Sequence, residues 1–334
     1  MKKNIAVVGC GYWGKNLVRN FADLGSLYAV CDPDTEVANN FSKKYKVQNL
    51  SFKEIINDSN IVGVVLAVPA TLHASFAIDA MKALKNVYVE KPLAMNEIEA
   101  MQMIAVAKEK NVNLMVGHLL QYHPIFRAVR NLVVSGQLGN LNYLYSNRLS
   151  LGKIRTEEDI IWSFAPHDIS MILSLANEEL ETVNTESTSI LQDNIADIAQ
   201  IHMQFNSGLK AHVSVSWLNP YKEQKLVVIG EKMTVVFDDV KPWNEKIAVY
   251  KHKVEFKDKK PIVLKADVEY LDIPEAEPLK EECKYFVDLI NGDVPPLTDG
   301  EEGMRVLKVL SAASISKEKN IKVIMNANGV IKDI

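Results

Sequence analysis

The sequence has few of the features that mark secreted or membrane proteins. It contains three cysteines, Cys10, Cys31 and Cys283, and no CxxC motif, so neither a disulfide framework nor a cysteine zinc site is expected. Its longest apolar run, residues 61–70, is broken by a glycine and a proline and falls short of the roughly 20 residues that cross a bilayer. The amino terminus leads directly into a predicted strand, so no signal peptide is expected. These absences predict a cytoplasmic protein.

The chain also lacks an excess of positive charge. Lys and Arg number 38 against 42 Asp and Glu, giving a net charge of −4, so neither nucleic acid nor a membrane surface is an expected partner. Hydrophobic residues make up 48% and charged residues 24%, as in globular proteins. Because 334 residues exceed the roughly 250–300 that one core supports, we expect two domains, residues 1–122 and 123–334.

The first of these segments alternates apolar runs with helical patterns. Such runs occupy residues 4–8, 27–31, 61–68, 87–90 and 113–117. Continuous apolar strands separated by helices predict a doubly wound parallel sheet covered on both faces. Ligands of such sheets bind beyond the carboxyl ends of the strands. The residues that follow each strand are therefore the candidates for function.

A GxGxxG motif occupies residues 9–14, between the first strand and the first helix. In this setting it predicts a dinucleotide site. Gly9 permits the tight turn, Gly11 allows the backbone to approach a pyrophosphate, and Gly14 lets the helix pack closely on the strand. Two further residues of the loop are assigned to the cofactor, Tyr12 and Trp13.

An acidic residue, Asp32, ends the second predicted strand. Its carboxylate is placed to accept hydrogen bonds from the ribose hydroxyls of the cofactor and would repel a 2′-phosphate. No arginine follows in the next residues, 33–34, to receive that phosphate. NAD is therefore favoured over NADP.

Titratable and aromatic residues follow the third, fourth and fifth strands. Lys91 ends a buried strand, where proximity to a nicotinamide would lower its pKa and let it hydrogen-bond a substrate hydroxyl and stabilise a developing alkoxide. The alternative is a structural lysine paired with Glu90. Other candidates at these strand ends are Pro69, His73, Glu90, Lys91 and Gln121 for the cofactor, and Lys91 and Tyr122 for the substrate.

The glycine motif, Asp32, the tripeptide Glu90-Lys91-Pro92 and a later histidine together resemble the glucose–fructose oxidoreductase / inositol dehydrogenase (Gfo/Idh/MocA) family, over nearly the whole chain. The resemblance implies a Rossmann domain followed by an α/β domain built on a large, mostly antiparallel sheet. It also implies that Lys91 acts with a histidine of the second domain and that the Lys91–Pro92 bond is cis. Members associate through that sheet, which implies a homodimer or homotetramer.

Beyond residue 123 the pattern changes to strands joined by tight turns. Strands are predicted at 141–149, 181–190, 196–205, 210–217, 225–229 and 234–237, with a helix at 167–176. The family pattern of an aspartate, three residues and the catalytic histidine falls on Ser163 and His167. His167 would be the general base that takes the hydroxyl proton, although a structural histidine is the alternative. Ser163 replaces the aspartate, which argues against polyol substrates.

Three cations, Arg148, Lys153 and Arg155, lie at the end of one strand and in its loop. Such a loop can bind a diphosphate through charge-assisted hydrogen bonds, although a solvated basic loop is equally consistent. The segment from this loop to His167 looks like family members that oxidise the 3-hydroxyl of a UDP-N-acetylhexosamine or its uronate. Trp217 is expected to border the same site as a stacking surface.

The sequence thus predicts an NAD-dependent oxidoreductase acting on a nucleotide-activated sugar. No metal is expected, because no His/Asp/Glu cluster has a ligand spacing and hydride transfer to NAD needs none. Two alternatives remain open. One is an inositol, polyol or simple-sugar dehydrogenase, and the other is a non-catalytic NAD-binding regulatory protein.

Overall fold

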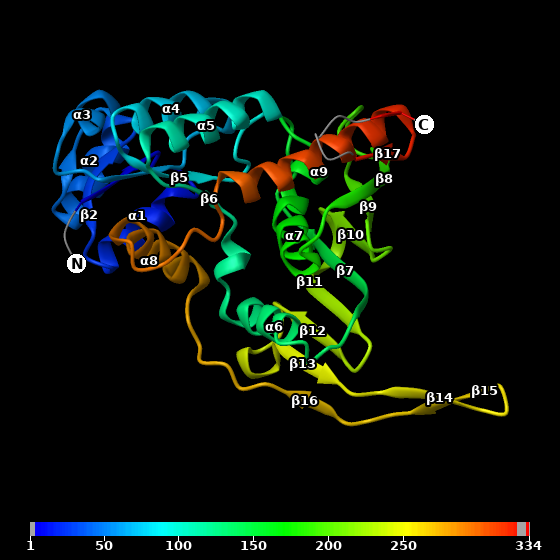
Figure 1. The fold of residues 1–334 in the computed structure, drawn as a ribbon. Coiled ribbons are helices and arrows are strands. Elements are labelled where there is room, and N and C mark those ends of the chain that lie inside the picture. The colour runs from blue at the N-terminus through cyan, green and yellow to red at the C-terminus, as the bar shows by residue number, and fades with distance from the viewer. Residues whose placement is uncertain (1–3, 326–331, 334) are drawn as a thin grey trace. The chain divides into compact units, whose positions relative to one another are not determined.

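The computed structural model describes residues 4–325 and 332–333. The chain divides into two compact units, one formed by residues 1–123 with 276–307 and the other by 124–275 with 308–334 (Figure 1). The sequence placed all of 123–334 in the second domain, so the units differ from that expectation at 276–307. Among the described residues, no helix is long and apolar enough to cross a membrane.

The first unit contains a six-stranded parallel sheet in the order β3-β2-β1-β4-β5-β6. The strands are β1 (Ile5–Val8), β2 (Leu27–Cys31), β3 (Gln48–Asn49), β4 (Gly63–Leu66), β5 (Asn86–Glu90) and β6 (Leu114–Gly117). Because the strand order reverses between β1 and β4, the turn after β1 lies at the topological switch point where such sheets bind ligands.

Helices cover both faces of this sheet. They are α1 (Gly14–Asp23), α2 (Thr35–Tyr45), α3 (Phe52–Asn57), α4 (His73–Lys82), α5 (Glu97–Lys110) and α8 (Pro278–Asn291). Helices α4 and α5 lie side by side on one face, and α1 and α8 on the other (Figure 1). Both faces of the sheet are therefore covered, as its continuously apolar strands require.

Helix α8 joins the first unit through its apolar side. The Phe286 ring lies edge-on to Phe21 of α1, with centroids 6.3 Å apart, and 5.7 Å from the ring of Tyr88 on β5. Glu277, just before α8, forms an ion pair with Arg19 of α1. These contacts explain why 276–307 packs with the first unit although it follows the second in sequence.

The second unit contains a ten-stranded sheet in the order β16-β13-β12-β11-β7-β10-β9-β8-β17-β18. Only the β7–β10 pair is parallel among the described pairings. The strands are β7 (Leu141–Leu151), β8 (Leu180–Thr188), β9 (Ile198–Phe205), β10 (Lys210–Ser216), β11 (Leu218–Gly230), β12 (Thr234–Asp238), β13 (Ile247–Tyr250), β16 (Val268–Tyr270), β17 (Val323–Ile324) and β18 (Lys332–Asp333). The predicted fold class, a parallel Rossmann sheet followed by a mostly antiparallel one, is confirmed.

The helices of the second unit pack on one face of this sheet. Helix α7 (Ile160–Ala176) contacts β7, β9 and β10, and α6 (Pro124–Val134) contacts α7 and β12. Helix α9 (Gly300–Lys319) begins in the first unit and ends in the second. A separate hairpin of β14 (Lys253–Lys257) and β15 (Lys260–Leu264) extends from the β13–β16 edge (Figure 1).

Candidate active site

The glycine turn between β1 and α1 is fixed by contacts that exclude larger residues at two of its glycines. Gly9 has φ +91°, and a Cβ there would lie 2.4 Å from the carbonyl oxygen of Ala67. A Cβ on Gly14 would lie 1.9 Å from the carbonyl oxygen of Gly9. A Cβ on Gly11 would meet no atom within 4 Å. Gly11 therefore borders open space at the start of α1, where a pyrophosphate would bind, and the loop fits a dinucleotide.

Asp32 joins the end of β2 to this turn. One of its carboxylate oxygens accepts a hydrogen bond from the backbone N–H of Cys10 at 2.6 Å, and the other accepts one from the N–H of Asp34 at 2.9 Å. Each oxygen has a further lone pair. The carboxylate thus lies beside the turn, as the predicted role in binding the adenosine ribose requires.

The two aromatic residues of the turn behave differently. Trp13 donates a hydrogen bond from its indole Nε1 to Oε1 of Glu90 at 2.6 Å. Tyr12 is 81% exposed, and the Lys15 ammonium lies 5.1 Å from its ring centroid. This hydrogen bond connects the glycine turn to the end of β5, and it was not predicted from the sequence.

Glu90 and Lys91 follow one another at that end of β5. Glu90 also accepts a hydrogen bond from the Tyr88 hydroxyl at 3.1 Å. Burial raises the pKa of the Glu90 carboxyl, opposed by its hydrogen bonds and by the charge of Lys91. Lys91 is half-buried, and its bond to Pro92 is cis, as the resemblance implied.

His73 has a different environment from the one expected of a cofactor ligand. Its ring is buried, with Nδ1 2.7 Å from the carbonyl oxygen of Pro92 and Nε2 3.0 Å from that of Val68. Burial lowers the pKa of the imidazole. The ring therefore holds together the loops that follow β4 and β5, the second of which contains Pro92, the residue after Lys91. Pro69 begins the turn of the first of these loops.

Gln121 and Tyr122 lie in a short 3-10 turn after β6, and both are buried. The Tyr122 hydroxyl is 2.6 Å from Oγ1 of Thr298, which itself donates to the carbonyl oxygen of Val116 at 2.7 Å. Tyr122, expected to contact substrate, therefore lies in the core of the first unit. A nearby pair that the sequence did not reveal joins His118 to Glu302, with Nδ1 2.5 Å from Oε2.

The largest difference in the second unit concerns the helix that carries His167. The sequence predicted a start at His167, after Pro166, whereas α7 begins at Ile160. Its N-cap is Asp159, whose carboxylate accepts from two backbone N–H groups of the first turn. Proline normally ends a helix because it lacks an N–H, which explains the error. Since Ser163 and His167 are four residues apart in one helix, their side chains lie on the same side of α7.

Asp168, the residue after His167, is buried against β7. Its Oδ2 is 2.5 Å from Nε of Arg148, its Oδ1 is 3.3 Å from an Arg148 terminal nitrogen, and the Ser146 hydroxyl donates to Oδ1 at 2.5 Å. Arg148, predicted to bind substrate phosphate, is therefore paired with Asp168. This ion pair holds α7 against β7 next to the candidate base.

The other two predicted cations lie in the loop between β7 and α7. Lys153 is exposed. Arg155 is half-buried, with Nε 3.7 Å from Oε1 of Glu158, and its carbonyl oxygen accepts from the Gln192 side chain at 2.9 Å. The loop thus keeps basic side chains near the start of α7.

Trp217 does not provide the stacking surface that the sequence suggested. Its side chain is fully buried, and its indole donates to Oδ1 of Asp197 at 2.5 Å. The other carboxylate oxygen of Asp197 accepts from the backbone N–H of Ile190 at 2.6 Å and of Leu191 at 2.8 Å. Burial opposes ionisation, but these hydrogen bonds outweigh it and hold the pKa of Asp197 below 3.8.

The Asp197→Asn variant is expected to lower the free energy of unfolding by about 1–3 kcal/mol, because an amide must turn an N–H₂ toward one of these donors. A carboxyl group whose pKa is lower in the folded state stabilises the fold fully above its unfolded-state pKa. This stabilisation is lost as the pH falls through the folded-state pKa. The difference from wild type should therefore be constant between about pH 5 and 7 and shrink only below about pH 4. Calorimetric unfolding across this range measures it.

The exposed neighbour Asp193 supplies the control. Asp193→Asn should unfold at the wild-type temperature. A stability difference for Asp197→Asn that already changes between pH 5 and 7 would contradict the assignment.

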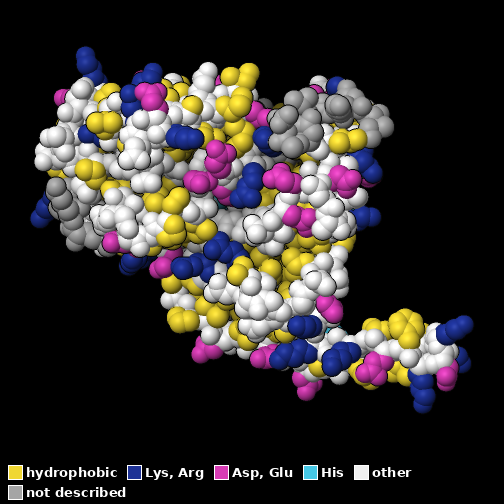
Figure 2. Space-filling model, viewed as in Figure 1, with side chains coloured by type: hydrophobic (Ala, Val, Ile, Leu, Met, Phe, Trp, Pro, Cys, Tyr) yellow, Lys and Arg dark blue, Asp and Glu magenta, His cyan; other side chains and the backbone are white. Residues whose placement is uncertain are grey.

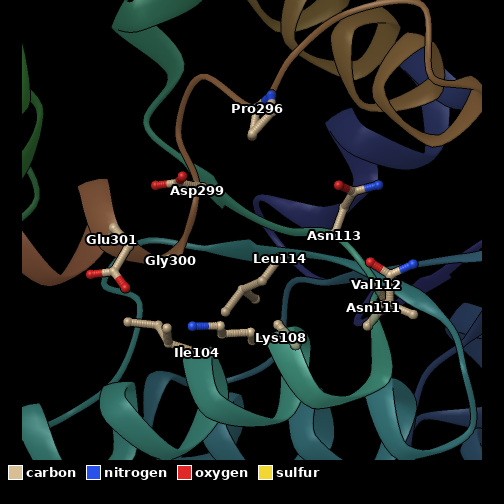
Figure 3. Close-up of a pocket in the computed structure, with 11 residues that line it drawn as sticks. Ile104, Lys108, Asn111, Val112, Asn113, Leu114, Pro296, Asp299, Gly300 and Glu301 are labelled. Carbon is tan, nitrogen blue, oxygen red and sulfur yellow. The ribbon is translucent and has the colours of Figure 1, made fainter.

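A surface cavity of about 300 Å³ lies elsewhere in the first unit (Figure 3). It is lined by residues of α5, by residues 111–114 at the start of β6, and by residues 296 and 299–301, and contains none of the predicted site residues. Lys108, from α5, and Glu301, from the start of α9, both extend toward it (Figure 3). Within the described part of the chain, no group of three or more His, Cys, Asp or Glu side chains could hold a metal ion.

Comparison with known proteins identifies both halves of the chain. Residues 3–118 match the model of the Gfo/Idh/MocA oxidoreductase family, NAD-binding Rossmann fold, and residues 126–236 match the GFO/IDH/MocA C-terminal domain.

Two curated relatives span almost the whole chain. Myo-inositol 2-dehydrogenase of Thermotoga maritima is 25% identical over 95% of this chain and 98% of the relative. UDP-N-acetylglucosamine 3-dehydrogenase of Acidithiobacillus ferrooxidans is 24% identical over 93% of this chain and 96% of the relative.

Solved structures share the fold. The structure of that Acidithiobacillus enzyme superposes with a TM-score of 0.83, covering 95% of this chain and 98% of the other at 24% identity. The WlbA dehydrogenase of Bordetella pertussis, solved with NADH and UDP-GlcNAcA, gives 0.78, covering 98% and 99% at 20% identity. Together with the two domain matches, the glycine turn and the Glu90-Lys91-Pro92 strand end place this chain in the Gfo/Idh/MocA family of NAD-binding oxidoreductases.

Proposed function

We propose that this chain oxidises a hydroxyl group, at C3, of a nucleotide-activated sugar such as a UDP-N-acetylhexosamine or its uronate, with NAD as the hydride acceptor. The observation that carries the choice of substrate is Ser163, one helical turn before His167 on α7, where the polyol-type pattern has aspartate. Lys153 and Arg155, before the same helix, supply positive charge for a diphosphate.

In the proposed mechanism each residue has one task. Lys91 hydrogen-bonds the reacting hydroxyl and stabilises the negative charge that develops on its oxygen. His167 takes the hydroxyl proton as the C–H bond breaks. NAD supplies the acceptor for the hydride, so that the alcohol loses a hydride and a proton and becomes a ketone. Asp32 and the glycine turn hold the dinucleotide.

A substrate panel tests the proposal. The purified chain is mixed with NAD and UDP-GlcNAc, UDP-GlcNAcA or myo-inositol, and NADH formation is followed with and without a 2-oxo acid, which would reoxidise NADH held on the protein. We expect turnover with a UDP-sugar only. UDP without the sugar should raise the melting temperature, because a ligand that binds only the folded state stabilises it.

Other outcomes would replace the proposal. A higher kcat/KM for myo-inositol than for either UDP-sugar would favour the polyol alternative, which the Thermotoga relative represents. NAD binding without turnover of any alcohol would favour a regulatory protein. By the same resemblance we also propose that copies of the chain associate as a homodimer or homotetramer.

A further inference from the structure

Helix α8 contains a buried carboxyl group that the proposed mechanism does not use. Figure 2 shows acidic and basic side chains interspersed over one face of the molecule, where water solvates both. Glu282 has no such surroundings: it is 1% exposed, and within the described residues neither of its carboxyl oxygens has a hydrogen-bond partner. Because an ionised carboxylate without water or a partner is strongly destabilised, this group requires an explanation.

Tyr88 connects this carboxyl group to the candidate active site. The Tyr88 side chain is fully buried on β5, and its hydroxyl donates a hydrogen bond to Oε1 of Glu90 at 3.1 Å. The carboxyl group of Glu282 lies beside the same hydroxyl, outside hydrogen-bonding geometry. A phenol has one proton and gives it here to Glu90, so toward Glu282 it offers only a lone pair. A carboxyl group approaches that lone pair favourably only when it is itself protonated.

The surroundings of the two carboxyl groups favour negative charge on Glu90. This group accepts hydrogen bonds from the Trp13 indole at 2.6 Å and from Tyr88. The charge of Lys91 also lowers the pKa of Glu90, against the effect of burial. For Glu282, burial and the charge of Glu90 raise the pKa well above the usual range, and only the Tyr88 hydroxyl opposes them. Because two buried carboxyl groups that repel each other share one proton, the proton belongs on Glu282.

Among the described residues, the other titratable groups around Glu282 provide no counter-charge. Tyr122, in the turn after β6, and Cys283, on α8 itself, are buried, and burial raises the pKa of both well above the usual values. Both are therefore neutral. From α1, Arg19 forms an ion pair with Glu277, the residue that precedes α8. A protonated Glu282 is thus the arrangement that leaves no charge on this side of α8 without a partner.

The hydrogen bond that depends on the charge of Glu90 lies at the cofactor turn. Trp13 is the N-cap residue of α1, and a helix binds a pyrophosphate through the backbone N–H groups of its first turn. A hydrogen bond to a carboxylate is roughly twice as strong as one between neutral groups. An ionised Glu90 therefore fixes the start of α1 more firmly than a protonated one.

We propose that Glu282 is a positioning residue for NAD: as a neutral acid beside Tyr88, it leaves Glu90 as the single anion of the pair, and this anion holds Trp13 and the glycine turn in place. Loss of the Glu282 proton would set a second negative charge against Glu90. The two groups could then relax only by separating, which loosens the bond to Trp13. The inference rests on the NAD binding of the proposed function but not on the identity of the substrate.

The pH dependence of stability tests where the proton lies. Glu282→Gln replaces the acid with a neutral group of the same shape. A carboxyl group whose pKa is higher in the folded state stabilises the fold fully below its unfolded-state pKa, about 4.3 for Glu, and this stabilisation is lost as the pH rises toward the folded-state pKa. Relative to Glu282→Gln, the unfolding equilibrium constant of the wild type should therefore rise about tenfold per pH unit between about pH 5 and 6. Urea unfolding of the full-length chain without NAD measures it.

The preceding residue on α8 supplies the matched control. Glu281→Gln makes the same substitution at a half-buried position, and it should keep the pH dependence of the wild type. If the ratio of the unfolding constants of the wild type and Glu282→Gln stayed constant between about pH 5 and 7, the proton would not lie on Glu282 and the proposal would be overturned.

NAD binding tests the positioning role itself. Calorimetric titration with NAD, without any sugar, gives the dissociation constants of the wild type and of Glu282→Gln. From about pH 6 to 9 the wild-type constant should rise about threefold or more relative to that of the variant, because only the wild type can lose this proton. An equal pH dependence in the two proteins would overturn the role. A chain that binds no NAD would overturn the proposed function as well, whereas normal NAD binding with no turnover of any sugar would contradict the proposed function alone.

Discussion

Replacing Lys91 with methionine should lower kcat for the sugar substrate by about 10²–10⁴-fold, the range found when an acid–base group or an oxyanion donor is removed. Methionine keeps the length and most of the volume of lysine but has neither the charge nor the N–H donors. The affinity for NAD should change little, because the glycine turn and Asp32 are untouched. Steady-state NADH formation measures kcat, and calorimetric titration with NAD measures the affinity.

A second lysine at the other end of the same strand provides a matched control. Lys85 immediately precedes β5 and is buried, and its ammonium donates to the carbonyl oxygens of Asp58 at 2.7 Å and Ile61 at 2.8 Å. Burial lowers the pKa of this ammonium. Lys85→Met should therefore lower the melting temperature and leave kcat near wild type, the reverse of Lys91→Met. A wild-type kcat for Lys91→Met would contradict the proposed mechanism.

The sequence predicted the first unit well because its information there is local. Each buried parallel strand is a continuous apolar run, and the glycine motif requires a strand before it and a helix after it. The strand ends then follow from topology, which places Asp32 and Lys91 at the carboxyl edge of one sheet. No long-range contact has to be known for this step.

The sequence predicted side-chain environments at those strand ends less well. A histidine after a buried strand can face a ligand or bond to the backbone, and only the fold shows that His73 contacts the carbonyls of Val68 and Pro92. Tyr122 depends in the same way on Thr298, which lies 176 residues away in the chain. Local patterns contain no information about such partners.

Two of the differences between prediction and structure in the second unit have opposite causes. Pro166 is a strong local signal that is overridden, because the Asp159 cap and the buried side of α7 stabilise a helix that continues through it. The β14–β15 hairpin at 253–264 gives a weak signal, since its two apolar stretches are short and four charged residues, 257–260, separate them. The pairing of the two stretches becomes visible only in the structure, where the register places Val254 opposite Val263.

Replacing Gly11 with valine should weaken NAD binding by roughly 10- to 100-fold, the effect of losing one or two charge-assisted hydrogen bonds, without reducing stability. Its φ is not in the left-handed region, and an added Cβ meets no atom within 4 Å. The side chain would instead occupy the space through which the backbone approaches the pyrophosphate. Calorimetric titration measures the affinity for NAD, and a thermal scan without NAD measures the stability.

Gly14 should respond in the opposite way. In Gly14→Ala the new Cβ would lie 1.9 Å from the carbonyl oxygen of Gly9, a backbone atom that cannot move without opening the turn. The melting temperature without NAD should therefore fall, whereas that of Gly11→Val should not. If Gly11→Val bound NAD like the wild type, the open space beside Gly11 would not be the pyrophosphate site. If it were as unstable as Gly14→Ala, the glycine would serve the fold rather than the cofactor.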